Sequence, residues 1–461
     1  MTDPRSVLVL GLGVSGQATA RYCAGLAATG ALASVAVLDS SDSPALRGVA
    51  DELSTLGVSV ELGASTVAER YDVCVVSPGI PPHAHLMVAA RAMCDSVVSE
   101  VEFAFSRSTR PWIAITGTNG KTTTTALVAH LLETGGVSAR AVGNIGPTAI
   151  SAVADERDGE VLVAEVSSFQ LAFTETFHPN VAVLLNLTPD HINWHGSLEK
   201  YAADKARLFA NLGSEDVAVI DVDDSGSAPY AEAVASRGVP VITVSRFGGR
   251  GAGASVVDGM LVLQTRGGAV RLVSEDELQI RGAHNVSNAL AASAAAHAMG
   301  VTAAKIQAGL RTFMPIEHRL EPVETVAGVQ WFNDSKATNP DAVFKALTAF
   351  GESPLVVLLG GRNKGNDFRQ LAEAVDARCK AAVLFGEARA ELANAFCGLG
   401  IHVVEAVTLA DAVEVASQLA VQGDAVVLSP ACASFDEFDS YEHRGEIFKS
   451  LVAAMAGESA G

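Results

Sequence analysis

The sequence predicts an α/β protein built from three open, mostly parallel sheets, and three observations support this. Short Val/Ile/Leu runs alternate with Ala-rich stretches, which is the sequence form of parallel βαβ units. The 461 residues exceed what one hydrophobic core usually serves, so several domains are expected. The balance of 49% hydrophobic and 18% charged residues is typical of globular α/β layers rather than of disordered or fibrous chains. We expect three open α/β domains, at residues 1–99, 100–316 and 317–461.

Each block shows its own strand-like runs, and those of the last block are each followed by Gly, Ser or Pro. The runs lie at residues 7–10, 35–38 and 73–76, then 161–164, 181–185 and 217–220, then 355–359, 381–385 and 425–428. A helix-like stretch at 100–107 marks the first boundary. Between Ser255 and Gly282, the Asp-Gly and Gly-Gly pairs that interrupt alternating runs predict antiparallel hairpins, followed by an Ala-rich helix over 285–299.

Charge and cysteine usage narrow the class of partners. The net charge of −20 disfavours nucleic acid and acidic membranes over most of the surface, so we expect neither nucleic-acid binding nor membrane insertion. The six cysteines form no C-x-x-C pair, which argues against a zinc site and a disulfide framework. The chain shows no charged-then-apolar leader and no uninterrupted apolar run long enough to span a membrane. We expect a cytoplasmic protein with reduced thiols, and a monomer.

A glycine-rich turn follows a β-branched strand run in the second block. Residues 113–116 lead into Gly117, Gly120, Lys121 and Thr122. Glycines let backbone N–H groups converge on phosphate oxygens at a helix start, while the lysine adds a charge and the threonine hydroxyl can hold magnesium. The strict P-loop has four residues between its glycines, whereas here the glycines are separated by Thr118 and Asn119 alone. The turn predicts ATP binding, and the alternative is a glycine-rich turn with an incidental lysine.

A second nucleotide signal lies in the first block. Gly11, Gly13 and Gly16 follow the first strand run, and Asp39 closes the second, at the offset where a carboxylate can bond a ribose hydroxyl. This Rossmann-like fingerprint favours NAD or FAD when taken alone, although the same geometry serves any nucleotide ribose or diphosphate. The alternative is a tight turn without a ligand. Together with the phosphate loop, the fingerprint indicates two phosphorylated ligands.

These and several distant motifs resemble the ATP-dependent Mur ligases of peptidoglycan synthesis. The shared motifs occur in the family's order, at residues 116–122, 142–146, 165–171, 186–191, 284–289, 317–319, 333–339 and 428–436. The last two look most like those of the D-glutamate-adding members. The resemblance implies a Rossmann-like N-terminal domain for a UDP-sugar, a central P-loop ATPase-like domain and a Rossmann-like C-terminal domain for the amino acid. It also implies a cytoplasmic ligase that joins UDP-N-acetylmuramoyl-L-alanine to D-glutamate through an acyl phosphate and a tetrahedral intermediate.

The resemblance assigns ATP, Mg²⁺ and catalytic residues in the later two blocks. The ATP-binding set is Gly117, Thr118, Asn119, Gly120, Lys121, Thr122, Thr123, Asn285, Asn288, Arg319 and Asp334. The catalytic set is Lys121, Glu165, His191 and Lys205, and two Mg²⁺ ions would be held by Thr122, Glu165, His191 and Lys205. In the family the lysine matching Lys205 is carbamylated, which requires an unprotonated amine, so we expect burial or neighbouring cations to lower its pKa.

The plainer readings of these residues stay open at this point. Glu165 could be a strand-end carboxylate, His191 a hydrogen-bonded structural histidine and Lys205 a solvated lysine. Asn285 and Asn288 lie three positions apart on one helix face, where a cap is the alternative. Arg319 and Asp334 could equally be partners of a surface pair.

The resemblance also assigns the two substrates. The UDP-sugar set is Ser15, Asp39, Ser77, Gly79, Asn144, Ser167 and Gln170, where the turn at 77–79 offers free N–H groups to a diphosphate. Ser40, Ser41 and Asp42 stand where some relatives carry a basic residue, which leaves the uracil contacts open. The D-glutamate set is Thr338, Lys364, Ser434, Phe435 and Tyr441. A solvated lysine is the alternative for Lys364, and core packing for the two aromatic residues.

Three rival functions remain at this stage. An NAD-dependent oxidoreductase would use the Gly11 to Asp39 segment but leave the phosphate loop without a task. A nucleotide-switch protein would use the loop, yet Asn363-Lys364-Gly365-Asn366 lacks the final Asp of the guanine-reading N-K-x-D pattern. Folylpolyglutamate synthase resembles the two later blocks but does not explain the nucleotide-binding block before residue 100.

Overall fold

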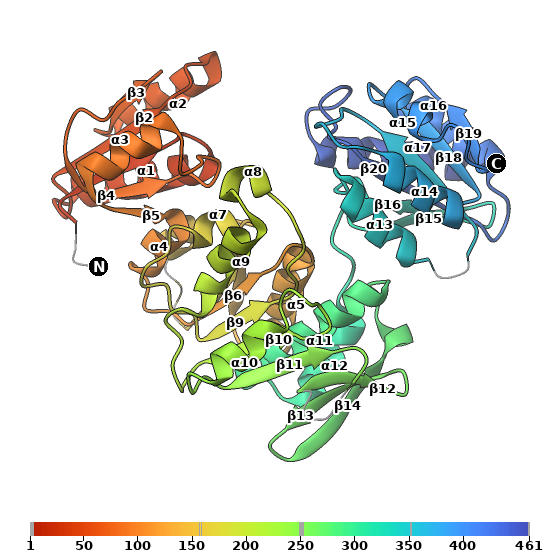
Figure 1. The fold of residues 1–461 in the computed structure, drawn as a ribbon, viewed down its shortest axis with the longest axis horizontal. Coiled ribbons are helices and arrows are strands. Elements are labelled where there is room, and N and C mark those ends of the chain that lie inside the picture. The colour runs from red at the N-terminus through yellow and green to blue at the C-terminus, as the bar shows by residue number, and fades with distance from the viewer. Residues whose placement is uncertain (1–3, 156, 158, 249–252, 351–352, 460–461) are drawn as a thin grey trace. The chain divides into compact units, whose positions relative to one another are not determined.

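The computed structural model describes residues 4–155, 157, 159–248, 253–350 and 353–459. The chain forms three sheets of five, nine and six strands (Figure 1). It separates into two compact units, the first of which holds Met1–Glu277 and Ser287–Arg311 and the second Leu278–Val286 and Thr312–Gly461. The predicted α/β class with three sheets is confirmed, whereas the predicted domain boundaries stay predictions.

The five-stranded sheet is parallel and has the order β3-β2-β1-β4-β5. Its strands are β1 (Ser6–Leu10), β2 (Ser34–Asp39), β3 (Ser59–Leu62), β4 (Tyr71–Val76) and β5 (Cys94–Ser99), and its helices are α1 (Val14–Ala28), α2 (Pro44–Thr55), α3 (His85–Met93) and α4 (Glu100–Phe105). Alternate strand residues serve opposite faces: Val7 and Val9 pack in one cluster with α1, and Leu8 and Leu10 in another with α3. Both faces are therefore buried, as parallel sheets require.

The nine-stranded sheet carries the phosphate loop. Its order is β14-β13-β12-β11-β10-β9-β6-β8-β7. The strands are β6 (Trp112–Thr116), β7 (Ala139–Gly143), β8 (Val161–Glu165), β9 (Val181–Leu184), β10 (Val217–Asp221), β11 (Val241–Ser245), β12 (Ala254–Val257), β13 (Met260–Thr265) and β14 (Gly268–Ser274). Only the β12-β13-β14 end pairs antiparallel, which confirms the predicted hairpins.

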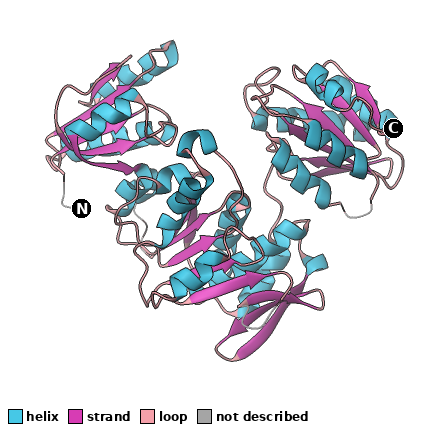
Figure 2. Ribbon diagram, in the orientation of Figure 1, coloured by secondary structure: helices cyan, strands magenta, loops and turns pink. Residues whose placement is uncertain are grey.

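Helices flank this sheet, as Figure 2 shows. They are α5 (Lys121–Thr134), α6 (Ala149–Ala154), α7 (Ser168–Leu171), α8 (Ile192–His195), α9 (Leu198–Ala206), α10 (Pro229–Ala235), α11 (Ala283–Ala298) and α12 (Ala303–Thr312), with 3-10 turns at Arg207–Phe209 and Glu275–Glu277. One hydrophobic cluster runs from β1 through Phe103 and Trp112 into β10, so the first two sheets share part of their core. This shared core explains why both belong to the first unit.

The six-stranded sheet forms the second unit with the order β15-β16-β20-β17-β18-β19. Its strands are β15 (Glu321–Val326), β16 (Val329–Asn333), β17 (Leu355–Gly360), β18 (Ala381–Phe385), β19 (His402–Glu405) and β20 (Ala425–Ala431), and its helices are α13 (Pro340–Thr348), α14 (Arg369–Arg378), α15 (Arg389–Ala395), α16 (Leu409–Leu419) and α17 (Tyr441–Ser459). Val357 faces the cluster with α14, and Val356 the cluster with α16 and α17. The antiparallel β15-β16 hairpin was not predicted from the sequence.

All six cysteines lie in the described part of the chain and are free thiols; Cys397 is exposed, Cys379 is half-buried and the other four are buried. Among the described residues, no helix combines the length and apolar character needed to cross a membrane.

Candidate functional site

The predicted phosphate loop lies at the carboxyl end of β6, between β8 and β9. Ile115 is in register with Glu165 of β8, and Thr116 with Leu184 of β9. In parallel sheets the carboxyl ends of adjacent strands share one edge, where ligands bind. The sheet therefore brings the loop, Glu165 and the segment after β9 to one place, as expected from their positions after strand runs.

The loop has a backbone that only glycine adopts readily. Gly120 has φ +83°, and a Cβ there would lie 2.4 Å from Asn288 Oδ1, so a side chain at this position would be strained and would clash. Asn186 supports the other side, accepting the Asn119 N–H at 2.8 Å. The Lys121 ammonium donates to the carbonyls of Gly117 at 3.1 Å and Thr118 at 2.9 Å. Asn288 is thus placed against the loop, as the sequence-based assignment requires.

Lys205 is buried beside the same loop, with 2% of its surface exposed. Its Nζ donates to Gly117 O at 2.8 Å and to Thr116 Oγ1 at 3.3 Å, and it lies 4.9 Å from the Tyr201 ring centre. Burial, reinforced by repulsion from Lys121, lowers the pKa of Lys205 well below its ordinary value. The reading of Lys205 as a solvated lysine is wrong, and the expected lowering of its pKa is confirmed.

The charges of two carboxylates, Glu165 and Asp190, act on Lys205 and raise its pKa, against the effect of burial. Glu165 is 4% exposed, and its Oε2 has no hydrogen-bond partner among the described residues. Asp190 accepts the His191 N–H at 2.9 Å, and its Oδ2 lies 3.4 Å from His191 Nε2. Buried carboxylates are normally hydrogen-bonded, so the orphaned oxygen of Glu165 marks a place that a cation or donor would fill.

Lys121, Lys205 and Asp190 line one cavity of 270 Å³ within the first unit. Its lining residues are Pro78, Gly79, Thr118, Lys121, Asn144, Ser167, Ser168, Phe169, Asp190, His191, Tyr201 and Lys205. His191 has left-handed backbone geometry (φ +51°), and its ring lies 4.7 Å from that of Phe169. Tyr201, which the sequence did not single out, contacts Thr118 through its hydroxyl at 2.9 Å.

The predicted UDP-sugar residues of the first sheet surround the turn after β1. Asp39 accepts the N–H groups of Leu12 at 2.7 Å and Ser41 at 2.8 Å. Ser77 donates to Gly11 O at 3.0 Å. A Cβ at Gly16 would lie 1.9 Å from Gly11 O, so α1 must begin with a glycine in its first turn. Ser15 lies just after this turn, in the first turn of α1.

The remaining UDP-sugar predictions lie nearer the cavity. Gly79 and Asn144 are exposed in its wall. Ser167 and Gln170 form a capping box at the start of α7: Ser167 Oγ accepts the Gln170 N–H at 3.3 Å, and Gln170 Oε1 accepts the Ser167 N–H at 2.9 Å. Their side chains are committed to the helix start, which holds the wall of the cavity in place.

In the second unit, Asp334 follows β16 in a buried position. Ser429 donates to Asp334 Oδ2 at 2.7 Å, and the Leu320 N–H donates to its Oδ1 at 3.2 Å. Burial raises the pKa of Asp334 to about 7. Arg319 lies near enough for its charge to act on Asp334 in the opposite direction. The reading of Asp334 as part of an exposed surface pair is therefore wrong. Asn285, also in this unit, donates to Arg281 O at 2.7 Å.

The predicted D-glutamate residues come from three loops of the second unit and from the first position of α17, where Tyr441 lies. Arg362 and Ala433 exchange backbone hydrogen bonds at 2.8 and 3.0 Å, which joins the loop of Lys364 to that of Ser434. Lys364 is exposed and Ser434 is 2% exposed. Thr338 lies in the third loop, between β16 and α13, and its N–H donates to Lys336 O at 2.8 Å.

The two predicted aromatic residues of this set differ in exposure. Phe435 is 63% exposed, so the core reading of this residue is wrong. Tyr441 is half-buried, and the Lys336 ammonium lies 3.6 Å from its ring centre. Arg444, which sequence analysis missed, is fully buried and donates to Ser335 O at 2.9 Å and Cys432 O at 3.2 Å. It ties two of the loops together.

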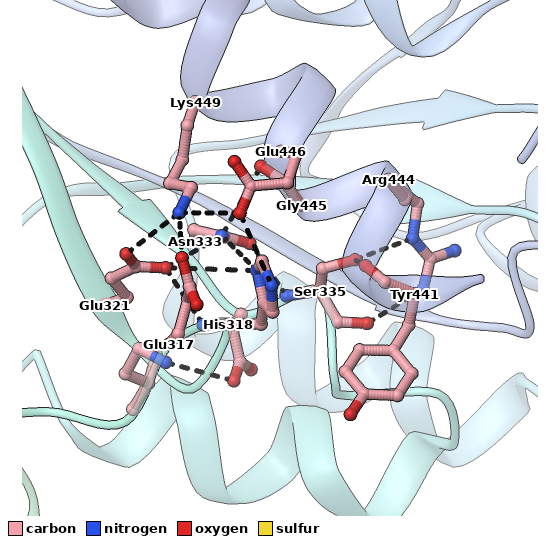
Figure 3. Close-up of polar contacts among 12 residues, drawn as sticks. Glu317, His318, Glu321, Asn333, Ser335, Tyr441, Arg444, Gly445, Glu446 and Lys449 are labelled. Atoms are coloured by element: carbon pink, nitrogen blue, oxygen red, sulfur yellow. Dashed lines mark hydrogen bonds and ion pairs between the residues drawn. The ribbon is translucent and has the colours of Figure 1, made fainter.

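A charged cluster lies beside these loops (Figure 3). The Lys449 ammonium contacts Glu317, Glu446 at 2.9 Å and Glu321 at 3.4 Å. Burial lowers the pKa of Lys449, but its hydrogen bonds to the glutamates outweigh burial and raise the pKa above its ordinary value. His318 lies next to this cluster and receives a hydrogen bond from Asn333 Nδ2 at 2.9 Å. No local sequence pattern pointed to Lys449.

Comparisons with known proteins agree with this architecture. A model described as the Mur ligase middle domain matches residues 115–296, and one described as the Mur ligase, glutamate ligase domain matches residues 318–432. A UDP-N-acetylmuramoylalanine–D-glutamate ligase from Pelotomaculum thermopropionicum is 42% identical, with 98% of each chain covered. The chain belongs to the Mur ligase family. A ligase of the same name from Koribacter versatilis is 41% identical, again with 98% of each chain covered.

Solved structures support the fold of this Mur ligase. A UDP-N-acetylmuramate-alanine ligase from Thermotoga maritima aligns with a TM-score of 0.59 at 18% identity, covering 98% of this chain and 99% of that one. A pseudomurein peptide ligase type C from Methanothermus fervidus aligns with a TM-score of 0.60 at 17% identity, covering 98% of this chain and 100% of that one. At these identities the alignments establish the fold alone.

Proposed function

We propose that this Mur ligase uses ATP to join D-glutamate to UDP-N-acetylmuramoyl-L-alanine, in peptidoglycan precursor synthesis. The observation that carries the proposal is the match over 98% of both chains to relatives that bear the name of this one ligase. The cavity is consistent with it, because the phosphate loop, two lysines and Asp190 line it, and Glu165 lies close enough for its charge to act on Lys205. Use of ATP, six free thiols and a strongly acidic chain also support action in the cytoplasm.

The described residues fit ATP with magnesium. The backbone at Gly117 and Gly120 forms a loop that a Cβ would obstruct, and the buried Glu165 oxygen lacks a partner among the described residues. Bound Mg²⁺ neutralises phosphate charge and prefers oxygen ligands. Thr122 and Glu165 would hold it. Lys121 would exchange its loop carbonyls for phosphate oxygens, stabilising the charge that develops as the substrate carboxylate attacks the γ-phosphate.

We further propose that Lys205 is carbamylated and holds a second Mg²⁺ together with His191. Burial lowers the pKa of this amine and so favours its unprotonated form, which is the form that reacts with CO₂. The carbamate would turn a cation into an anion beside Glu165 and Asp190, and a second ion would then offset three like charges.

Selection of D-glutamate is assigned to the second unit. An amino acid with two carboxylates needs cations or donors at a fixed separation. Lys364 offers a cation and Ser434 and Thr338 offer hydroxyls, from loops that Arg362, Ala433 and Arg444 hold in place. Phe435 and Tyr441 would flank the amino-acid side chain. The acyl phosphate made from the L-alanyl carboxylate would then be attacked by the amine, through a tetrahedral intermediate.

The test is phosphate release from ATP with UDP-N-acetylmuramoyl-L-alanine and Mg²⁺, in separate reactions with D-glutamate, L-glutamate, L-lysine or no amino acid. We expect release only with D-glutamate and a product mass corresponding to one added glutamyl residue. Turnover with a different amino acid would keep the ligase reaction and overturn the D-glutamate pocket. Absence of turnover by folded protein would overturn the proposed function.

A further inference from the structure

A buried hydrogen-bond chain links three segments around the reaction cavity. His195, the last residue of α8, places Nδ1 2.8 Å from Asp204 Oδ2 and Nε2 3.0 Å from Ser168 Oγ. The side chain of His195 is 0% exposed and that of Asp204 is 2% exposed. Ser168 is 2% exposed and lines the cavity together with Lys121 and Lys205. The proposed function assigns no role to this network of His195, Asp204 and Ser168.

The carboxylate of Asp204 determines which group donates and which accepts in each hydrogen bond of this network. An ionised carboxylate only accepts hydrogen bonds, and the other Asp204 oxygen forms an ion pair with Lys200. The Nδ1–H of His195 therefore donates to Asp204. In the neutral ring the second nitrogen, Nε2, is then an acceptor, and it takes the hydroxyl proton of Ser168. The Ser168 oxygen keeps only lone pairs for other partners.

Packing holds the histidine ring in this orientation. Phe169 stacks on it with planes 8° apart and centroids 5.6 Å apart, and Tyr201 meets it edge-on at 5.3 Å. The ring therefore cannot turn to reverse its hydrogen bonds without disturbing the cavity wall. A serine whose hydroxyl proton is committed in this way is a fixed acceptor at the reaction cavity.

We propose that Ser168 is a substrate-contacting residue that accepts a hydrogen bond from a substrate N–H, and that His195 and Asp204 are positioning residues that make it an acceptor. The inference rests on the proposed function, in which two substrate groups carry N–H: the amide of the L-alanyl arm and the attacking amine of D-glutamate. A fixed acceptor favours either group and disfavours a carboxylate oxygen in the same position, because two acceptors facing each other leave both unpaired. The chain thus contributes to substrate orientation.

The decisive experiment is a double-mutant cycle between Ser168→Ala and Asp204→Asn, read by kcat and by KM for each substrate. Ser168→Ala removes the acceptor, and we expect about a 10- to 100-fold loss of kcat/KM. In Asp204→Asn the new amide turns its oxygen to Lys200 and donates an N–H to Nδ1 of His195. This reverses the chain, so that Ser168 presents its proton to the cavity, and a loss of similar size is expected. The double variant should be no worse than Ser168→Ala within about threefold, because Asp204 acts through Ser168.

The substrate whose KM rises in Ser168→Ala identifies the donor: the UDP-sugar for the L-alanyl amide, D-glutamate for the amine. Lys200→Gln is the matched control, since it removes the ion pair to Asp204 but keeps the carboxylate, and its kinetics should stay within about twofold of the natural protein. A purely structural role would give losses that multiply in the double variant, or Ser168→Ala kinetics within about twofold of the natural protein. Either result would overturn the inference.

A second pair of variants covers the case in which Asp204→Asn does not fold. His195→Gln can still donate to Asp204 and accept from Ser168, whereas His195→Met can do neither. We expect His195→Gln to retain at least about tenfold more kcat/KM than His195→Met, and equal losses would contradict the inference. If the natural protein itself shows no turnover, the proposed function and this inference fail together; turnover by the natural protein with multiplying losses removes the inference alone.

Discussion

Lys205 in the first unit and Lys449 in the second place the same ammonium group in opposite surroundings. Lys205 is 2% exposed and donates to a carbonyl and a hydroxyl, and its pKa is lowered. Lys449 has 22% of its side chain exposed and contacts three glutamates, and its pKa is raised. Burial with neutral partners disfavours the charged form of a lysine, whereas carboxylate partners favour it. The first environment prepares a lysine for chemistry, and the second uses it to hold structure.

The largest expected effect is on turnover when Lys205 is replaced. Lys205→Met fills a similar volume without an amine, and we expect kcat to fall by about 100- to 1000-fold, as when an enzyme loses one electrostatic group at the reacting centre. Steady-state kinetics with saturating substrates would measure this. A kcat within about threefold of the natural protein would show that Lys205 is merely a buried structural lysine.

The role of the Lys205 amine can also be tested without a substitution, through the dependence of activity on CO₂. If Lys205 reacts with CO₂, protein prepared in CO₂-free buffer should lose activity and regain it on addition of bicarbonate. Lys205→Met should show no response, because it lacks the amine.

An intermediate effect, on stability rather than turnover, is expected for Lys449. Lys449→Met leaves three glutamates together and should lower the free energy of unfolding by about 1–2 kcal/mol. The hydrogen bond from Lys449 lowers the pKa of Glu317 from its ordinary 4.5, so the stability it contributes is present above pH 4.5 and is lost as the pH falls through the lowered pKa. Urea unfolding at pH 7 and below pH 4 should show the difference between the two proteins narrowing in acid. Lys449→Arg, which keeps the charge, is the control.

The smallest effect is expected where an ion pair is exposed on both sides. Arg21 and Glu52 pair at 3.0 Å with side chains 41% and 53% exposed. Solvent screens such a pair, so Arg21→Ala should change the melting temperature by less than about 2 °C. A fall as large as that of Lys449→Met would mean that partial burial is not what distinguishes the Lys449 cluster.

Most of the fold was predictable because its elements have local signals. The strand run at 113–116 and the glycines after it predicted β6 and the loop at its end, and the hairpins before Gly282 were read from Asp-Gly and Gly-Gly pairs. The β15-β16 hairpin was missed, since β15 is mostly exposed or half-exposed and both strands adjoin the motifs at 317–319 and 333–339 that were assigned to ligands. The six residues of β15 include only Val323 and Val326 as aliphatic side chains, which is too few to give an alternating pattern.

The candidate-site residues named from the sequence stand in recognisable motifs, and residues outside such motifs were missed. Lys121 and Thr122 stand in one loop, whereas Ser168, His195 and Asp204 are brought together across 27 and 9 positions in the sequence. The buried Arg444 sits in a helix, and its partner Ser335 is 109 positions away. Such contacts depend on how helices are packed on the sheet, and residue types alone do not encode them.

The distribution of cysteines makes the natural sequence convenient for site-specific labelling. Burial raises the pKa of Cys23, Cys379 and Cys432 to about 12, which leaves these thiols mostly in their unreactive form at neutral pH. Cys397 is exposed near the start of the segment between α15 and β19. A maleimide dye should therefore attach first to the second unit without any substitution. One cysteine engineered into the first unit would then suffice to test, by energy transfer between two dyes, whether the distance between the units changes when nucleotide is added.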